Sequence, residues 1–274
     1  MANYAEHQVF AGGCQTRYVE AGSGDTLLLL HSVDPGCSGT LEYRKNIDAL
    51  SRHFRVIVPD LMGFGKTSLP DHKIGNLSNE YTAHIVAFMD ALGLEKVHLA
   101  GNSRGGLISV AIMAEFPERV GRIVLIANAG GGVTKEYFEK QSAANASFRP
   151  TPDQLRQVLS NSYYSLDRDM APEVFEEYAA NAIIQYGRYD AIGGLPADVP
   201  DLRPALAKAT HPILYVFGTN DNLWPPVHDG LDVFLSTPGA RYYMTSDCGH
   251  HPQTEKPTEM NWLMTAFLTG QLDN

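Results

Sequence analysis

The stretch "HLAGNSRGGLIS" places one serine between two glycines, where a short apolar run gives way to a helical pattern. Ser103 has Gly101 two positions before it and Gly105 two positions after it. A turn tight enough to expose the serine oxygen leaves no room for side chains at those positions, so glycine suits both. The free N–H groups of the following helix favour negative charge nearby. The pattern predicts a nucleophile whose attack creates an oxyanion, and the alternative is an ordinary strand-to-helix turn.

A serine hydroxyl is a weak nucleophile near neutral pH and needs a general base. Among ten histidines we favour His250 in "TSDCGHHPQTEKP", because it follows the last predicted strand and Gly249 frees its loop. His251 is its neighbour and its rival. The base needs a carboxylate to fix its tautomer, and Asp221 in "YVFGTNDNLWPP" follows a predicted strand at the same edge of the sheet. Asp60 in "PDLMGFGKTS" also follows a strand, and we interpret it as a structural residue that holds its glycine-rich loop.

An oxyanion needs two backbone N–H donors. One is expected from Arg104, directly after the nucleophile. The other is expected in "LLLLHSVDPG", the loop after an early strand, from Val33 or its neighbour Ser32. Because the backbone supplies both donors, the side chains at these positions are weak guides.

These residues are placed by short apolar runs that alternate with helical patterns. Continuous apolar runs suit strands buried on both faces of a parallel sheet. The strands are expected near residues 26–30, 55–60, 96–100, 122–127, 212–218 and 241–245, after a two-stranded start around the glycines at 12 and 13. Helical spacing of apolar residues marks "LEYRKNIDALSRH", "NEYTAHIVAFMDALG", "GGLISVAIMAEFPERV" and "TEMNWLMTAFLTG". The alternation predicts an α/β fold with a mostly parallel twisted sheet flanked by helices.

The alternation breaks between residues 133 and 203. Two consecutive helical patterns, "TPDQLRQVLSNSYY" and "APEVFEEYAANAIIQYGRYDAI", have no strand between them, and Thr151 followed by Pro152 is a good helix start. We interpret residues 133–203 as a helical lid inserted between a first part of the core, 1–132, and a second part, 204–274.

Composition narrows the class of protein. The 274 residues carry a formal net charge of -10 at pH 7, which disfavours nucleic acid and anionic membranes as partners. The N-terminus lacks the basic start and apolar run of a signal peptide. The three cysteines, Cys14, Cys37 and Cys248, are far apart and lack metal-binding spacing, so we expect reduced thiols in a cytoplasmic protein.

In these motifs, the chain resembles the α/β-hydrolase superfamily. The matching motifs are "HSVDPG", "PDLMGFGKTS", "GNSRGG", "GTNDNLWPP" and "CGHHPQ", and the order serine, aspartate, histidine is that of the superfamily. Within it the chain looks most like the meta-cleavage product hydrolases, which cut a C–C bond in vinylogous 1,5-diketones formed by ring opening of catechols. The likeness rests on Asn102, Pro35-Gly36, "NAGGG" from Asn128 and the helical lid. It implies triad roles for Ser103, Asp221 and His250, and it places Asn102 in the substrate pocket.

The chain also departs from the pattern of that family. The family favours glycines where this chain has Ser32, Val33 and Asp34, and a tryptophan where it has His251. The family places a lid arginine against the acidic end of the substrate. Arg188 is the nearest arginine, although a gap-free alignment puts Tyr178 closer to that position. Arg104 beside a nucleophile is unusual, and a structural ion pair and a substrate carboxylate are both compatible with it.

We therefore expect a serine-triad hydrolase that acts on a partly apolar small molecule with a polar or acidic end. Expected substrate contacts come from Ser32, Asn102, Tyr178, Arg188, Trp224 and His251. No metal or organic cofactor is implied, and a homodimer is left open. A carboxylesterase or lactonase with the same triad is the second hypothesis. A non-hydrolytic receptor or cofactor-free oxygenase on this fold is the third, because fold does not fix function.

Overall fold

The apolar runs assemble into one eight-stranded sheet. The computed structural model describes residues 4–128, 130–131, 147–190, 199–223 and 229–273. The strand order is β1-β2-β4-β3-β5-β6-β7-β8. Strands β3 to β8 run parallel, whereas β2 is antiparallel to β4 and forms a hairpin with β1. The strands are β1 (Ala5–Ala11), β2 (Cys14–Ala21), β3 (Thr26–Leu30), β4 (Arg55–Pro59), β5 (Val97–Asn102), β6 (Val120–Ile126), β7 (Ile213–Gly218) and β8 (Arg241–Thr245).

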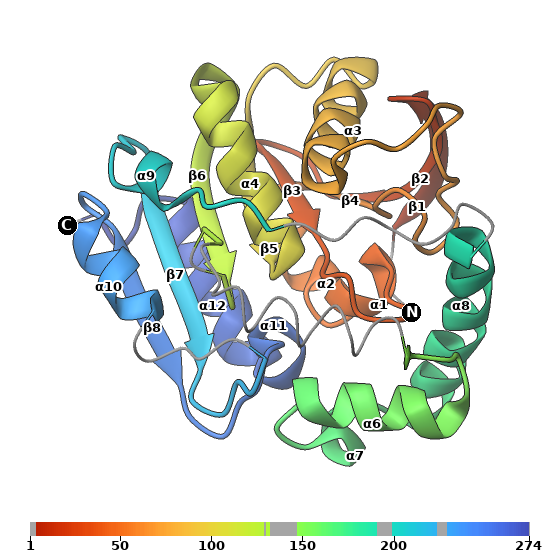
Figure 1. Cartoon of the computed structure of the whole chain (residues 1–274). Coiled ribbons are helices and arrows are strands. Elements are labelled where there is room, and N and C mark those ends of the chain that lie inside the picture. The colour runs from red at the N-terminus through yellow and green to blue at the C-terminus, as the bar shows by residue number, and fades with distance from the viewer. Residues whose placement is uncertain (1–3, 129, 132–146, 191–198, 224–228, 274) are drawn as a thin grey trace.

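Burial on both faces explains why the central strands are continuously apolar. In β3, Leu28 and Leu30 pack into one buried cluster, while Leu27 and Leu29 pack into a second cluster on the other face. Side chains of α3 (Leu77–Ala91) and α4 (Arg104–Glu115) belong to the first cluster, and those of α12 (Pro257–Leu268) belong to the second. Figure 1 shows α3 and α4 in front of the sheet and α12 behind it. The α/β prediction is confirmed.

A set of helices without a described strand lies between β6 and β7. It comprises α6 (Pro152–Ser162), α7 (Leu166–Asp169), α8 (Pro172–Asp190) and α9 (Arg203–Leu206). Thr151 caps α6 by accepting a hydrogen bond from the Gln154 N–H, and Pro152 occupies the first turn, as the sequence predicts. Figure 1 shows α6, α7 and α8 beyond the carboxyl ends of the central strands. This is the place where a lid would cover residues that follow those strands.

One expected helix is divided in two. The pattern "LEYRKNIDALSRH" predicts a single helix, but the structure has α1 (Gly39–Tyr43) and α2 (Ile47–Leu50), separated by a turn. The amide of Asn46 in that turn donates to the Gln253 carbonyl at 2.9 Å and to Asn261 Oδ1 at 2.8 Å. These tertiary contacts come from the C-terminal helices α11 (Pro252–Glu255) and α12, so local periodicity could not reveal them.

The remaining elements are a 3₁₀ turn, η1 (Pro117–Arg119), and α10 (Asp229–Ser236). Within the described ranges, none of the helices is both long enough and apolar enough to pass through a lipid bilayer.

Candidate active site

Ser103 sits at the junction of β5 and α4 in a strained conformation. Its φ is 51° and its ψ is −114°, a combination that non-glycine residues rarely adopt. A Cβ added at Gly105 would lie 2.1 Å from the Leu30 carbonyl oxygen, and one at Gly101 would lie 2.2 Å from the Gly105 carbonyl carbon. Both glycines are therefore required for β5, α4 and β3 to approach closely enough to form the turn. The Ser103 N–H donates to the Ile126 carbonyl at 2.9 Å, which anchors the turn to β6.

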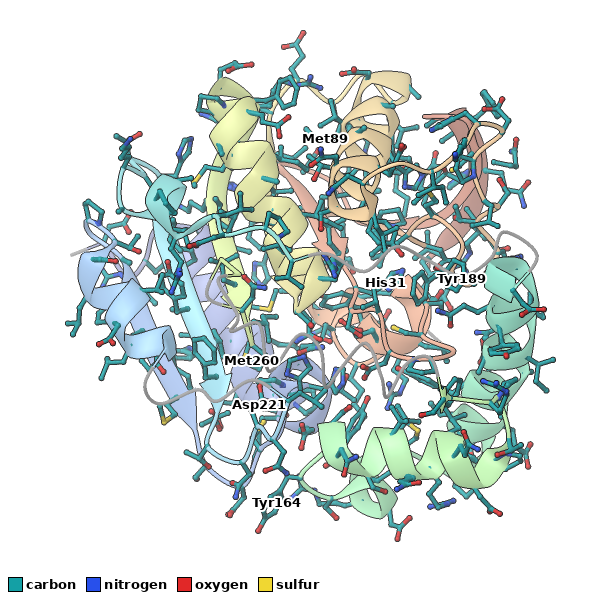
Figure 2. The ribbon with its side chains drawn as sticks, viewed as in Figure 1. His31, Met89, Tyr164, Tyr189, Asp221 and Met260 are labelled. Atoms are coloured by element: carbon teal, nitrogen blue, oxygen red, sulfur yellow. The ribbon has the colours of Figure 1, made fainter. Side chains whose placement is uncertain are left out.

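His250 and Asp221 form a buried pair. His250 Nδ1 lies 2.7 Å from Asp221 Oδ2, and both side chains are almost fully buried. Asp221 follows β7 and His250 follows β8, so neighbouring strands bring them together. A Cβ on Gly218 would lie 2.2 Å from the Gly249 carbonyl oxygen, so the two loops are in direct contact. In Figure 2, Asp221 lies below the end of β7, and Tyr164 on the lid lies farther down.

Asn102 joins the histidine loop to the serine turn. Its side-chain Nδ2 donates to the His250 carbonyl at 2.9 Å and lies 3.3 Å from the Ile126 carbonyl. The His250 N–H donates to the Ser162 carbonyl at the end of α6, at 2.7 Å. The backbone of His250 is thus fixed both to the residue before Ser103 and to the lid. The described structure gives Asn102 Oδ1 no protein partner, so this oxygen is the part of the side chain left for other contacts.

The charges around His250 favour its protonated form. Burial opposes a charge on the imidazole, but Asp221, Asp34 and Glu42 outweigh it and raise the pKa of His250 to about 9. An imidazolium at this position is what a base becomes after it takes a proton from a serine. The site is therefore arranged to stabilise the product of that proton transfer.

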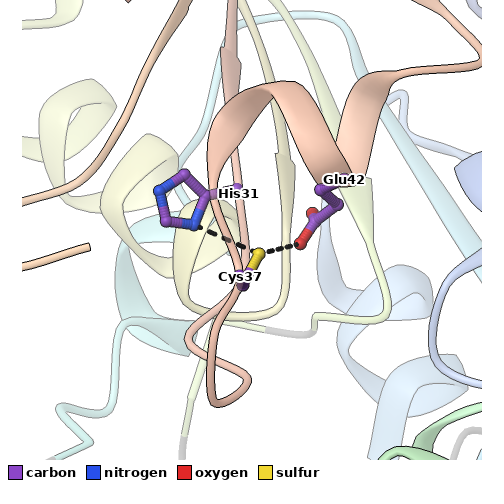
Figure 3. A group of neighbouring side chains, drawn as sticks. All are labelled: His31, Cys37 and Glu42. Carbon is purple, nitrogen blue, oxygen red and sulfur yellow. Dashed lines mark hydrogen bonds between the residues drawn. The ribbon is translucent and has the colours of Figure 1, made fainter. Parts of the chain in front are cut away.

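The loop after β3 is held by a buried polar cluster, of which Figure 3 draws His31, Cys37 and Glu42. Glu42 Oε2 accepts from the Ser32 N–H at 2.9 Å, from the Ser32 hydroxyl at 2.7 Å and from the Cys37 thiol at 3.1 Å. Because the Ser32 N–H is already bonded, Val33 is the better placed of the two expected oxyanion donors. Arg104, the other expected donor, is the first residue of α4, where backbone N–H groups point out of the helix.

His31, Cys37 and Glu42 offer ligand atoms within 4.8 Å of one another, which invites comparison with a metal site. The His31 ring is occupied at both nitrogens: Nδ1 lies 2.6 Å from the Ser32 carbonyl, and Nε2 accepts from the Leu61 N–H at 2.8 Å. Burial also lowers the pKa of His31, which keeps the ring neutral. A cation here would have to displace these hydrogen bonds, so the cluster is a brace for the loop.

His251 pairs with a second carboxylate. Its Nε2 lies 2.8 Å from Asp34 Oδ2, and its ring stacks on Tyr163 with centroids 4.5 Å apart. Burial alone would raise the pKa of Asp34, but the hydrogen bond and charge of His251 lower it below its ordinary value. Two of the departures noted in the sequence, Asp34 and His251, thus contact each other.

Comparison with known proteins identifies the family. The model of the α/β-hydrolase fold matches residues 25–257. The chain belongs to the α/β-hydrolase family. A 2-hydroxy-6-oxononadienedioate/2-hydroxy-6-oxononatrienedioate hydrolase of Klebsiella pneumoniae is 31% identical, over 91% of this chain and 89% of its own. A 2-hydroxy-6-oxo-2,4-heptadienoate hydrolase of Pseudomonas putida is 30% identical, over 96% of both chains.

A solved structure agrees with this assignment. The meta-cleavage product hydrolase of Pseudomonas fluorescens superposes with a TM-score of 0.84 at 28% identity, covering 97% of this chain and 98% of the other. The resemblance to the meta-cleavage product hydrolases is confirmed. This α/β-hydrolase is an enzyme whose relatives act on 2-hydroxy-6-oxo dienoates.

The arginines expected at the substrate of this α/β-hydrolase make contacts with the protein itself. Arg188 Nη1 donates to the carbonyls of Gly63, Gly65 and Thr67 at 3.0 to 3.2 Å, which fastens the end of α8 to the loop after β4. Arg104 Nη1 donates to the Ser78 hydroxyl on α3 at 2.6 Å. This bond ties the Arg104 side chain to α3, and both alternatives, the structural ion pair and the substrate carboxylate, stay open.

Tyr178 and Trp224 are two further expected substrate contacts. Tyr178 is buried on α8, and the described residues offer its hydroxyl no hydrogen-bond partner. Trp224 lies outside the described residues. Asp60 accepts from the N–H groups of Gly39 and Lys66 at 2.9 and 3.0 Å, in keeping with the structural function expected for it.

Glu42 and Glu255 shape this α/β-hydrolase site without being predicted from the sequence, and Asn128, known there only from the family likeness, has a specific contact. Glu42 braces the loop after β3, and Glu255 accepts from the N–H groups of Gly249 and His251. Asn128 donates to the Ser103 carbonyl at 2.8 Å. Glu255 follows His250 closely in the sequence, which is a local signal. Glu42 lies 10 positions from Ser32 and 211 from Gln253, and it belongs to no motif that points to these partners.

Proposed function

We propose that this α/β-hydrolase cleaves a C–C bond in a dienol or diketone acid of the meta-cleavage type, with Ser103, His250 and Asp221 as its triad. The observation that carries the proposal is the 2.7 Å contact of His250 with Asp221, on a loop bonded to the residue before Ser103. The names of the relatives support the substrate class.

The proposed reaction has two stages. His250 first helps move a proton from the enol hydroxyl to a carbon of the dienol, which gives the ketone. Ser103, or a water that it positions, then attacks the distal carbonyl while His250 takes the proton. The N–H groups of Val33 and Arg104 stabilise the oxyanion. The C–C bond breaks, its electron pair passes to the ketone end, and the proton returned by His250 makes this end the enol. Where Ser103 is the nucleophile, water then cleaves the acyl–Ser103 ester, which releases the carboxylic acid and restores the serine; where water attacks, the acid forms directly.

The proposed substrate contacts come from Asn102, which is bonded to the histidine loop, and from Tyr178 on α8. Asn102 Oδ1 and the Tyr178 hydroxyl have no described protein partner, so each can bond a polar group of the substrate without losing a protein contact. Arg188 is bound to three carbonyls, and we assign it to fixing the lid that closes over the apolar end.

A carboxylesterase or lactonase activity is the second candidate. The three carbonyl contacts of Arg188 favour it, because an ester or lactone substrate does not need a cation at its far end.

The ratio of two rates separates the candidates. A ring-fission dienoate should lose its visible absorbance much faster with the enzyme than in buffer, and aryl esters and simple lactones should be turned over only feebly. Rapid ester or lactone hydrolysis with a dienoate rate equal to that in buffer would leave the second candidate standing and remove the first.

A further inference from the structure

We propose that Asp34 is a positioning residue for His250: through His251 it fixes the loop of residues 249–251, and its carboxylate stabilises the imidazolium that forms on His250. This inference rests on the functions proposed for Ser103 and His250. It adds a second carboxylate, from a different strand, to the proton-transfer machinery.

Two adjacent histidines reach two carboxylates on different loops. His250 Nδ1 lies 2.7 Å from Asp221 Oδ2 after β7, and His251 Nε2 lies 2.8 Å from Asp34 Oδ2 after β3. The two rings are perpendicular, at 89°, with centroids 5.4 Å apart. The loop of residues 249–251 is therefore held from both sides of the serine strand β5, by Asp34 after the adjacent strand β3 and by Asp221 after β7, two strands away on the other side.

The hydrogen bond between His251 and Asp34 is largely buried, so its loss would not be made good by water. The side chain of His251 is 1% exposed and that of Asp34 is 13% exposed. Among the described residues, His251 Nδ1 has no hydrogen-bond partner, so the bond to Asp34 is the one described hydrogen bond that holds the ring. The His251 N–H is fixed separately by Glu255 at 3.1 Å. Loss of the Asp34 carboxylate would leave the ring held mainly by stacking on Tyr163.

The charges of Asp34 and His250 also act on each other. The groups that face His250 are Asp221, Asp34 and Glu42, with His251 beside it and Glu255 on the backbone of the same loop. Asp34 favours the protonated form of His250, and His250 in turn lowers the pKa of Asp34. This reciprocity is what linkage requires of two interacting ionisable groups. A charge that forms on His250 during catalysis is thus stabilised by Asp34 as well as by Asp221.

The first test is the rate at which a fluorophosphonate labels Ser103, measured against pH. This rate depends on proton removal from Ser103 and not on the natural substrate. In Asp34→Asn the labelling rate should rise at a lower pH than in the wild type, because one negative charge near His250 is lost. The proton concentration at the midpoint of the rise should be higher by about three-fold or more. The plateau rate at high pH should also fall, since a less basic imidazole is a weaker general base.

Matched variants separate charge from shape. Asp34→Glu should restore the wild-type pH dependence, while Asp153→Asn, at an exposed carboxylate on α6, should leave it unchanged. A purely structural function of Asp34 would lower the plateau of Asp34→Asn without moving its pH dependence. That outcome would overturn the electrostatic part of the proposal.

A second measurement needs neither a variant nor a reactive serine. In the wild-type protein, the carboxyl ¹³C resonance of Asp34 should show an inflection at the pH where the His250 ring loses its proton. A flat resonance through that transition would refute the coupling. If wild-type Ser103 resists labelling altogether, the proposed serine chemistry fails, and this titration still decides the question about Asp34.

Discussion

At the scale of the residue, the site depends on how Asp221 holds the His250 ring. A carboxylate that accepts from Nδ1–H fixes the tautomer that leaves Nε2 free to act as a base. Asp221 is itself held, because its Oδ1 accepts from the Leu223 N–H at 2.9 Å. Both partners are buried, so water offers little competition for the contact.

Asp221→Asn should therefore lower kcat by a factor of about 10³ to 10⁴, because the amide donates to Nδ1 and selects the wrong tautomer. Binding of a substrate analogue should change little, since Asp221 does not line the proposed contacts. Steady-state kinetics and a binding titration check the two parts. A loss of less than about ten-fold in kcat would count against Asp221 as the acid of the triad.

The pH dependence of activity follows from the raised pKa of His250. The folded protein favours the protonated ring, so the stabilising contribution of this charge is present below the ordinary pKa and is lost as the pH rises through about 9. The base must be neutral to accept a proton. The value of kcat/KM should consequently rise with pH toward a midpoint near 9 in wild-type enzyme. A profile that is flat from pH 6 to 10 would contradict this assignment.

At the scale of the element, close backbone contacts form the serine turn. Gly105 lies against the Leu30 carbonyl of β3, while Gly187 on the lid helix α8 has no atom within 4 Å of a Cβ position. The same substitution should thus have opposite effects at the two positions.

Gly105→Ala should reduce the free energy of unfolding by at least about 2 kcal/mol, because the new methyl group forces β3 and α4 apart. Gly187→Ala should increase it by about 0.5–1 kcal/mol, since alanine loses less backbone entropy in a helix. Denaturant titration of both variants provides the comparison. Equal effects would mean that the close approach of β3 and α4 is not needed for the fold.

The sequence predicts elements better than it predicts the contacts between them. The strands and the residues that follow them were recognised from apolar runs and glycines, because those signals are local. The interruption between α1 and α2 was not, because Asn46 bonds to residues more than 200 positions away. Asp34 and His251 both stand out as departures from the family pattern, but their pairing has no local signal because they lie 217 positions apart.

At the scale of the whole molecule, helices α6 to α8 share a buried apolar cluster with the core, to which they contribute Leu155, Leu159 and Tyr178, and polar contacts add to this packing. Arg188 binds three carbonyls of the loop after β4, and Gln185 on the same helix accepts from the Gly36 N–H at 2.8 Å. In Figure 2, Tyr189 on α8 lies toward His31, which follows β3. These contacts connect the lid to the two loops that shape the site.

Arg188→Met should weaken this junction and lower the free energy of unfolding by about 1–3 kcal/mol, since three backbone carbonyls lose a charged donor. Limited proteolysis should also cut the lid sooner. The control is Arg52→Met, at an exposed arginine outside the inserted helices, which should change the free energy of unfolding by less than about 0.5 kcal/mol. Equal stability of the two variants would show that Arg188 does not anchor the lid.

The proposed function requires the Ser103 hydroxyl to drive C–C cleavage. The direct measurement is the fate of a ring-fission dienoate mixed with wild-type enzyme and with Ser103→Ala, followed by its visible absorbance and by identification of the products. The account predicts that the wild-type enzyme yields one carboxylic acid and one enol, and that Ser103→Ala is slower by a factor of at least about 10³. Cleavage at the same rate by both proteins, or no cleavage by the wild-type enzyme, would contradict it.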